Sequence, residues 1–600
     1  MKLKILPLLL AACLLAGSLS ACDRKEETDS GTPLYAQQAQ AQRGTAAKAA
    51  AAPDAAAVLD CLARAGQIDD SGRESVAPAR DPESGRDLRL PNLDSTVVTA
   101  RNACIYTVDS YGLLVVSAAG AESRILSYTK LPSPEATMTR RLYVEGDRAA
   151  VVCSSALFDT DEAGNARDAA RTQVVVLDIS DPAAPKQLSC VSVDGTLQKA
   201  GFLKDTLCLL TGKELWGLPD RAEAEKLLPW IEEDGTKTTL RATDVYLRPD
   251  PARSALSLVT ALRLEDGRVA DAVALTDATD AAIFGAEGLY LARSRWQVEQ
   301  SDPDRETEPP YTIVSNTQRL GTEILRLEFD QHFHFTGSCF QQGGLSEDAA
   351  MSVYADCLRL ALQTQTCSFS AYTDETHGWT NYKLDSDARS SRIVLLDAAL
   401  QEESGQELDR IGGEQGVSSC RFVGEYAFLV TEKPNDPIFC ANLSDPASPA
   451  MGENLVLPGS CARFYGMGDG MILALSDDPT QENTTVLSVY GGEDPARLLR
   501  TDRISLRQSD RVLRVPELVF ADPESGYVAL PVQAEGTEYH LYRLEDGKLK
   551  KKGTTALEYV PDELRSVLIG GLLYVCGPGE LYVIDPESAE LLTTVSNAVG

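Results

Sequence analysis

The stretch "SSCRFVGEYAFLVTEKPNDPIFCANLSDPASPAMGENLVLP" at residues 418–458 sets out one complete structural unit. Apolar and polar residues alternate along four short runs, which is the period of half-buried β-strands. The runs cover residues 418–423, 426–431, 437–443 and 450–457. Gly424-Glu425 predicts a tight turn after the first run, and the Asp and Pro residues of "SDPASP" predict another after the third. The stretch therefore predicts a four-stranded antiparallel meander.

The octapeptide inside this stretch is written twice in the chain, which points to a repeat. "DISDPAAP" at 178–185 returns as "NLSDPASP" at 442–449, each time between strand-like runs. Nine candidate units with this pattern cover residues 97–130, 139–194, 198–275, 281–338, 352–408, 418–458, 461–506, 515–554 and 564–595. Units of ~40–50 residues with four strands each are typical of β-propeller blades.

The repeats predict an all-β chain with a single β-propeller over residues 94–600, because radial closure protects the edges of such sheets. We expect about eight four-stranded antiparallel blades, in a range of seven to nine, since the longer units carry insertions that need not be blades. An array of separate β-sandwich domains is the alternative. It is disfavoured because no linker-like stretch interrupts residues 94–600.

The N-terminus has the features of an export signal. "MKLKILPLLLAACLLAGSLSAC" places Lys2 and Lys4 before an apolar run and small residues, which predicts a signal peptide over residues 1–21. Leu19-Ser20-Ala21-Cys22 resembles the bacterial lipobox, in which the cysteine thiol is diacylated and becomes the first residue. We therefore expect Cys22 to anchor an extracytoplasmic protein to the cell membrane by its acyl chains. A plain signal peptide cut near Ala21 is the alternative.

A tether and a short helix are expected between the anchor and the repeats. Residues 22–52 are rich in Ala, Gln and Lys with few large apolar side chains, which predicts a flexible tether. Residues 53–93 predict a short helix and a polar lead-in. Pro53 and Asp54 begin that helix, and its apolar side chains, Val58, Leu59 and Leu62, fall on one face.

The charge balance limits the partners of the chain. It carries 56 basic and 89 acidic residues, a formal net charge of −33. Such a surface repels nucleic-acid phosphates and anionic lipid headgroups, so we expect no nucleic-acid partner and contact with the membrane only through the lipid anchor.

The segment "RFVGEYAFLVTEKPNDPIFCANLSDPASP" at 421–449 closely resembles the signature of bacterial secreted proteins with a C-terminal β-propeller domain, a family distantly related to WD40 repeats. "VVVLDISDPAAPKQL" and "DCLRLALQT" at 356–364 support this resemblance, which runs with gaps from about Val58 to about Val595. "PNLDST" at 91–96 and "CARF" after Gly459 depart from the family pattern. The resemblance implies the fold and surface exposure, and it carries over no catalytic residue.

Two short motifs resemble ligand-binding loops and are better explained as turns. "GMGDGM" at 466–471 is rich in glycine, but a strand follows it where a phosphate loop needs a helix N-terminus. "DTDEAGNARD" at 159–168 places Asp159, Asp161 and Gly164 at the offsets of a calcium loop. Ala163 and Ala170 stand where two of its oxygen ligands belong, so an acidic hairpin loop is favoured.

The histidines give little support for a metal or a catalytic base. His332 and His334 in "FDQHFHFTG" would share one strand face near Asp330, but no third or fourth ligand is identifiable. His377 and His540 are the only others, and no Gly-x-Ser-x-Gly elbow occurs. We therefore expect no cofactor and no metal, and we name no catalytic residue.

Two arginines and the cysteines complete the set of candidates. Arg421 in "SCRF" and Arg463 in "SCARF" stand at the same point of successive units, where they would line one face of the ring and hold an anionic partner. Pairing of both with local carboxylates is the plainer alternative.

The cysteines beyond Cys22 include Cys208 and Cys576 within apolar strands, so we expect most of them to be buried free thiols.

These observations predict a lipid-anchored, extracytoplasmic β-propeller that serves as a binding or scaffolding surface for an envelope protein or glycan. An extracellular hydrolase or lyase that uses carboxylates in the propeller channel is the first alternative. An envelope-assembly factor that captures client strands by edge addition is the second.

Overall fold

A computed structural model describes residues 49–65 and 98–596, apart from short gaps. The gaps are 109–111, 133–136, 156–157, 161–165, 169, 216, 250, 308–309, 346–349, 375–376, 378, 402–407, 410, 412–416, 432–436, 458, 460, 493–496, 534–536, 559–563 and 578–579. The predicted signal peptide at 1–21, Cys22, and most of the predicted tether and polar lead-in lie outside the described residues.

Four-stranded antiparallel units follow one another along the chain, and we number them from 1 to 9. Unit 1 holds β2 (Val98–Arg101), β3 (Cys104–Val108), β4 (Gly112–Ser117) and β5 (Ile125–Lys130). Unit 2 holds β6 (Thr137–Glu145), β7 (Arg148–Ser155), β10 (Arg171–Asp178) and β11 (Lys186–Asp194). Unit 3 holds β12 (Thr196–Leu203), β13 (Thr206–Glu214), β17 (Ala255–Arg263) and β18 (Arg268–Thr276).

The middle units contain the longest strands. Unit 4 holds β19 (Ala281–Phe284), β20 (Gly288–Gln300), β22 (Pro310–Phe329) and β23 (Phe333–Gln342). Unit 5 holds β25 (Met351–Tyr354), β26 (Cys357–Asp374), β27 (Trp379–Leu396) and β28 (Leu408–Asp409). Unit 6 holds β29 (Val417–Val423), β30 (Tyr426–Thr431), β31 (Phe439–Asn442) and β32 (Ala450–Met451).

The last three units lie between Cys461 and Ser596. Unit 7 holds β33 (Cys461–Gly466), β34 (Ile472–Asp477), β35 (Thr484–Gly491) and β36 (Leu499–Arg507). Unit 8 holds β37 (Phe520–Ala521), β38 (Tyr527–Gln533), β39 (Thr537–Glu545) and β40 (Lys548–Leu557). Unit 9 holds β41 (Arg565–Ile569), β42 (Leu572–Gly577), β43 (Glu580–Asp585) and β44 (Glu590–Ser596).

Short strands and helical segments accompany the four-stranded units. The short strands are β1 (Ala50–Ala51), β8 (Phe158–Thr160), β9 (Ala166–Asp168), β14 (Trp230–Glu233), β15 (Thr236–Thr239), β16 (Val245–Leu247), β21 (Asp304–Thr307) and β24 (Gly344–Leu345). The helices are α3 (Ala55–Ala65), α4 (Arg511–Arg514) and the 3-10 turns η2 (Gly120–Glu122), η3 (Arg221–Leu227), η4 (Ala242–Asp244) and η6 (Pro516–Leu518).

The nine units match the nine candidate stretches of the sequence and stand at the upper end of the predicted range of seven to nine. They occupy eight large sheets, because seven sheets hold one unit each and the ten-stranded sheet holds units 4 and 5. Those two units are joined by pairing between β22 and β26, which runs from Tyr311↔Asp374 to Arg319↔Thr366. The expectation of about eight blades in a range of seven to nine therefore agrees with nine units in eight large sheets.

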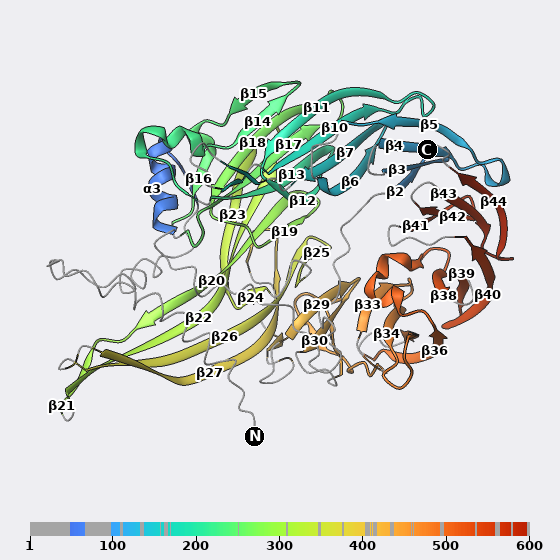
Figure 1. Ribbon diagram of the computed structural model, residues 1–600. Coiled ribbons are helices and arrows are strands. Elements are labelled where there is room, and N and C mark those ends of the chain that lie inside the picture. The colour runs from blue at the N-terminus through green and yellow to red at the C-terminus, as the bar shows by residue number, and fades with distance from the viewer. Residues whose placement is uncertain are drawn as a thin grey trace.

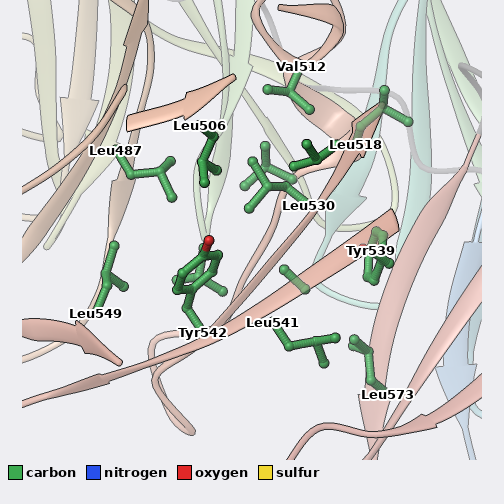
Figure 2. Packing of buried hydrophobic residues seen from close by; sticks show 14 of the residues in the cluster. Leu487, Leu506, Val512, Leu518, Leu530, Tyr539, Leu541, Tyr542, Leu549 and Leu573 are labelled. Carbon is green, nitrogen blue, oxygen red and sulfur yellow. The ribbon is translucent and has the colours of Figure 1, made fainter. Parts of the chain in front are cut away.

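Each unit packs face to face against the next through buried apolar side chains. The two middle strands of a unit are therefore apolar on both faces, as in β34 and β35, where every residue is buried. The fourth strand, such as β36, is mostly exposed. Figure 2 shows this packing where units 7, 8 and 9 meet, with Leu487, Leu506, Leu530, Leu541 and Leu573 in one cluster. Burial of each such side chain stabilises the fold by about 1.5–3 kcal/mol.

The units close into a ring. An apolar cluster that includes Ile105 and Val116 of unit 1 and Tyr574 and Val583 of unit 9 joins the last unit to the first. Figure 1 shows the red unit 9 beside the blue unit 1. The first strand of each unit, which we call its inner strand, lies towards the middle (Figure 1). Inner strands of neighbouring units contact one another, as β2 does with both β6 and β41.

The segment before the ring docks on its side. Asp54 caps α3 by accepting a hydrogen bond from the Ala57 N–H at 2.8 Å, and Val58 and Leu62 are buried against units 2 and 3. β1 pairs with β16, which runs parallel to β18 and so extends the sheet of unit 3. The short helix expected from residue 53 onward is therefore present as α3. Within the described parts of the chain, no helix combines the length and apolar character that crossing a bilayer requires.

Long strands of units 4 and 5 run beyond the ring and form what we call the arm, which covers residues 295–319 and 365–390. Figure 1 shows the arm projecting away from the ring, with β21 at its tip. Hydroxyl pairs cross its strands, including Thr317 with Ser368 at 3.3 Å and Thr373 with Thr380 at 3.0 Å. The arm is thus a polar extension of two neighbouring units.

Candidate functional site on the inner strands

Positive charge gathers on the inner strands of a chain whose formal net charge is −33. The inner strands carry seven basic residues, Arg101, Arg140, Arg141, Lys199, Arg421, Arg463 and Arg565, which we call the basic arc. Among the described inner strands the one acidic residue is Glu145. The described inner strands of units 4, 5 and 8 carry no charged residue. The charge of the inner strands is therefore opposite in sign to the net charge of the protein.

The structure brings Arg421 and Arg463 close in space but does not place them at the same point of their units. Each inner strand has a register shift near its start, between Val417 and Ser419 in β29 and between Cys461 and Arg463 in β33. Arg421 stands two residues after the shift in β29, whereas Arg463 stands directly at the shift in β33. The two side chains therefore share a strand face but do not occupy the same position in their units.

Arg463 lies near two other members of the arc, Arg421 and Arg565, and near Glu517. Its guanidinium stacks over the Tyr465 ring at 4.7 Å, and the Tyr465 hydroxyl donates to the Pro516 carbonyl of unit 8 at 2.9 Å. Burial lowers the pKa of Arg463, and the charges of Arg421 and Arg565 lower it further. Three guanidinium groups from units 6, 7 and 9 thus share one electrostatic environment.

The other side of the arc comes from units 1 to 3. Arg141 lies opposite Val152 and faces unit 3, and its Nε and Nη1 atoms are buried with no hydrogen-bond partner among the described residues. Arg101 of unit 1 stands 3.8 Å from Glu145 of unit 2. Guanidinium groups present planar forks of N–H donors that match carboxylate and phosphate oxygens. The arrangement is suited to holding an anionic group.

The glycine-rich motif is a turn, as the sequence predicts. The Met467 N–H donates to the Met471 carbonyl at 2.8 Å, and Gly468, Asp469 and Gly470 have positive φ. The strand β34 follows directly, so no helix N-terminus is available to a phosphate.

The calcium-like motif coincides with the hairpin of β8 and β9, whose pairing runs from Phe158↔Asp168 to Thr160↔Ala166. This agrees with the acidic hairpin loop that the sequence favours. Asp161 and Gly164 lie outside the described residues.

The two histidines do not share a strand face, which corrects the expectation from the sequence. β22 ends at Phe329 and β23 begins at Phe333, so His332 lies in the turn between them. His332 stands 3.7 Å from Asp271, whereas His334 stands 3.2 Å from Asp330, and the side chains are 71% and 55% exposed. No group of three or more His, Cys, Asp or Glu residues in the described structure is placed to hold a metal ion.

A buried charged cluster between units 3 and 4 did not emerge from the sequence. Arg293 donates to Asp277 at 2.5 Å and to Glu323 at 2.6 Å, and all three side chains are at most 2% exposed. A fourth member, Arg248, is buried beside them. The available signal was a charge within an apolar run, as in "LYLARS" and "TEILRL".

Inner strands, apolar middle strands and a closed ring of repeated units define this protein as a β-propeller. The chain belongs to the beta propeller domain family, whose model matches residues 95–585. This agrees with the resemblance of the 421–449 segment to propeller-bearing bacterial proteins.

Other proteins share parts of the chain. An uncharacterized protein of Archaeoglobus fulgidus is 24% identical over 218 residues, which is 36% of this chain and 33% of that protein. An uncharacterized protein of Methanocaldococcus jannaschii is 20% identical over 210 residues, 35% of this chain and 32% of that protein. The chain thus spans about a third of the length of the curated relatives it matches. The crystal structure of Citrobacter koseri AztD is similar over 82% of this chain and 94% of that chain, at 9% identity and a TM-score of 0.33.

Proposed function

We propose that this protein is an extracytoplasmic β-propeller lipoprotein that binds an envelope protein or glycan through an acidic group held by the basic arc. The observation that carries the proposal is the gathering of seven basic residues on the inner strands of a chain with a net charge of −33. A strongly acidic protein repels anions over long range, so a local basic wall selects ligands that enter the channel.

The charged residues of the inner strands favour binding of an anion over catalysis by carboxylates. A hydrolase or lyase of the kind considered from the sequence needs two carboxylates that converge on one bond. The described inner strands offer Glu145 alone, and it lies 3.8 Å from Arg101. Arginine forks supply no general base, because their pKa stays far above neutrality. They do supply oriented donors for a carboxylate or phosphate.

The test uses anionic probes of known chemistry. A fluorescent polyglutamate peptide and inorganic polyphosphate are titrated into the full chain and into R421Q and R463Q, at two salt concentrations. A hydrogen bond to a charged group contributes about 1.5–3 kcal/mol, so we expect about tenfold weaker binding or more for each variant. Binding should also weaken as salt rises.

The matched control is Arg221→Gln. Arg221 is an exposed arginine that pairs with Asp60 at 2.6 Å on the outside of the ring. This variant should bind both probes as the wild type does. Equal affinity of the wild type, R421Q and R463Q for both probes would contradict the proposed site.

The lipid anchor is proposed from the lipobox-like sequence and has its own test. Cys22→Ala should abolish labelling by a radioactive fatty acid and move the protein from the membrane fraction to the soluble fraction. Cys61→Ala, a change at a buried cysteine of α3, should leave labelling intact. Unchanged labelling of the Cys22→Ala variant would refute the anchor without touching the proposal for the channel.

A further inference from the structure

The strongest unexplained feature lies where the N-terminal segment, unit 3 and unit 4 meet. Arg248 directly follows β16, and its side chain is 1% exposed. Its backbone N–H donates to the Thr276 hydroxyl at 2.9 Å, and its carbonyl accepts from the Cys61 thiol of α3 at 3.5 Å. The residue is therefore fixed from both the ring and the docked helix.

The guanidinium of Arg248 has no acceptor. Its Nε, Nη1 and Nη2 atoms are all buried, and none has a hydrogen-bond partner among the described residues. The nearest carboxylate is that of Glu323, whose Oε2 lies 3.8 Å from Nη1. A direct N–H···O hydrogen bond spans about 2.7–3.2 Å, so this separation is too long for one. Five buried N–H donors without acceptors are costly to a fold.

The neighbouring carboxylates are already engaged elsewhere. Glu323 accepts from Arg293 at 2.6 Å through the same Oε2 atom. Asp277 accepts from Arg293 and from the backbone N–H groups of three residues at 2.7–2.9 Å, namely Ala252, Arg253 and Ala278. These bonds fix Asp277 and Glu323 towards Arg293 and leave Arg248 as the group whose charge is least compensated.

The electrostatics of the cluster agree with this geometry. Burial lowers the pKa of Arg248 to about 10, and the positive charge of Arg293 contributes to the lowering. The carboxylates of Glu323 and Asp277 act in the opposite direction but do not restore the ordinary pKa. A negative charge placed against the Arg248 guanidinium would supply what the protein's own groups do not.

We propose that the Arg248 guanidinium is a binding site for a small monovalent anion of about the size of chloride. A guanidinium accepts such an ion on its N–H fork, which satisfies the donors and the charge together. A water molecule would satisfy donors only. Because the Arg248 backbone also holds Cys61, the bound anion would fasten the N-terminal segment to the ring.

The first test compares chloride with gluconate, an anion too large for a site that is 1% exposed. Thermal unfolding of the full chain is followed as chloride replaces gluconate at constant ionic strength. We expect a saturable rise of the wild-type Tm, because a ligand that binds only the folded state stabilises it by mass action. Hydrogen exchange of α3 should slow over the same chloride range.

Variants separate this site from general salt effects. R248Q should lose the chloride dependence, whereas R221Q, which changes an exposed arginine paired with Asp60, should keep it. If R248Q does not fold, diffraction from wild-type crystals grown in bromide decides the question, with an anomalous peak expected beside the guanidinium. A water molecule alone at that position, or equal Tm values of the wild type in chloride and gluconate, would overturn the proposal. Neither outcome bears on ligand binding by the basic arc.

Discussion

Arg293 shows how single residues decide the stability of the junction between units 3 and 4. A guanidinium that is 2% exposed is tolerated because two carboxylates, Asp277 and Glu323, accept from it at 2.5 and 2.6 Å. Such a cluster contributes little beyond a well-packed apolar core, but removal of one partner leaves a buried charge unpaired. A substitution at one of these positions therefore destabilises the protein by far more than the intact cluster stabilises it.

Asp277→Asn should destabilise the protein by about 3–5 kcal/mol at pH 7, because it leaves Arg293 with one carboxylate. Although burial raises the pKa of Asp277, the charges of Arg293 and Arg248 and several hydrogen bonds lower it more, so the pKa lies below its usual value. The unfolded chain therefore binds this proton first, and the contribution of Asp277 is lost as the pH falls below about 4. Urea unfolding at pH 7 and pH 3.5 measures both effects.

Asp266→Asn is the matched control for that experiment. Asp266 pairs with Arg263 at 2.8 Å on the surface, where such pairs contribute about 0–1 kcal/mol. Equal losses in the two variants, or a loss in Asp277→Asn that does not shrink at low pH, would show that the buried cluster does not act as described.

The cysteines make a second prediction at this scale. The structure confirms the expectation of free thiols for the eleven cysteines whose side chains it describes, most of them buried. Burial raises the pKa of Cys208, Cys440 and Cys576 to about 12, so these thiols stay protonated at pH 8. A thiol reagent at pH 8 should label the native protein slowly. In denaturant without reductant more than half of the cysteines should react, and near-complete resistance would reveal disulfides instead.

Residues also show where reading the sequence succeeds and where it stops. Arg421 and Arg463 are visible because each stands in a recurring "RF" dipeptide, although the register shifts of β29 and β33, which set their offset, do not show in the sequence. Arg141 and Arg565 do not stand in a recurring dipeptide, and their position on inner strands is seen only in the folded ring. The four members of the Arg248 cluster come from four separate segments of the chain, so no local sequence pattern predicts the cluster.

At the scale of elements, α3 is held to the ring by one apolar face. Val58 and Leu62 have no exposed surface and pack into the cluster of units 2 and 3, while Asp60 lies on the outer face and pairs with Arg221. The 3.6-residue period of these apolar positions is what made the helix predictable from the sequence. Its docking surface was not predictable, because η3 lies more than a hundred residues away.

Leu62→Ala should weaken the docking of α3 rather than the ring itself. A buried Leu→Ala change costs about 2–5 kcal/mol, but the cost here cannot exceed the free energy with which the segment docks. Hydrogen exchange of residues 55–65 should therefore speed up while exchange in units 6 to 9 stays unchanged. Asp60→Asn, on the exposed face, should leave α3 protected. Uniformly faster exchange throughout the chain would mean that the segment unfolds only with the whole ring.

The arm carries its own protection against strand pairing. From Trp379 to Ser391, β27 is paired on one side by β26, and its other edge has no strand among the described residues. A register shift leaves no position of β26 opposite Asp385, which makes a bulge in the middle of this edge, although the Asp385 carboxylate accepts from the Ser370 hydroxyl of β26 at 2.5 Å. Bulges and alternating charges on an edge strand oppose pairing with another chain.

Deletion of Asp385 should convert this edge into a template for self-association. The deletion preserves every existing pair, because Leu384 already lies opposite Phe369 and Ser386 opposite Ser368. Leu384, which is 48% exposed, would then sit in an unbroken strand. Sedimentation velocity should show concentration-dependent dimers or larger species for the deletion variant. Asp385→Ser keeps the bulge and should remain like the wild type, and a monomeric deletion variant would argue that the charges alone protect the edge.

For the whole molecule, the repeat pattern predicted a ring, and the number of units was the uncertain part. The longer units carry insertions, and in 281–338 and 352–408 the extra length is that of β22 and β26, which each continue from a blade into the arm. The alternation of apolar and polar residues predicts the extent of a strand. It does not predict at which residue the strand leaves the ring. The closure of the ring could not be predicted either, since it joins residues far apart in the chain, as in the bond at 3.0 Å from the Gly120 N–H to the Tyr574 hydroxyl, 454 positions away.

The seam between units 9 and 1 is held by non-covalent contacts alone, because the chain does not run directly from one of these units to the other. All four strands of unit 1 come from Val98–Lys130 and all four of unit 9 from Arg565–Ser596, so no strand is shared across the seam. Closure rests on the apolar cluster that contains Val116 and Val583. Other neighbouring units are also joined by the chain itself, which limits how far they can separate. We therefore expect the ring to open first at this seam.

Val583→Asp tests this expectation, because it buries an unpaired carboxylate in the cluster that closes the ring. We expect a loss of more than about 4 kcal/mol, with limited proteolysis cutting first in units 1 and 9 while units 3 to 7 resist. Leu591→Asp is the control, since Leu591 belongs to the same unit but is 38% exposed and lies opposite Ile584, which packs towards unit 8 and not into the seam cluster. If Val583→Asp unfolds all units together, closure is needed for the stability of the whole ring. If it matches Leu591→Asp, the seam is not the weak point of the molecule.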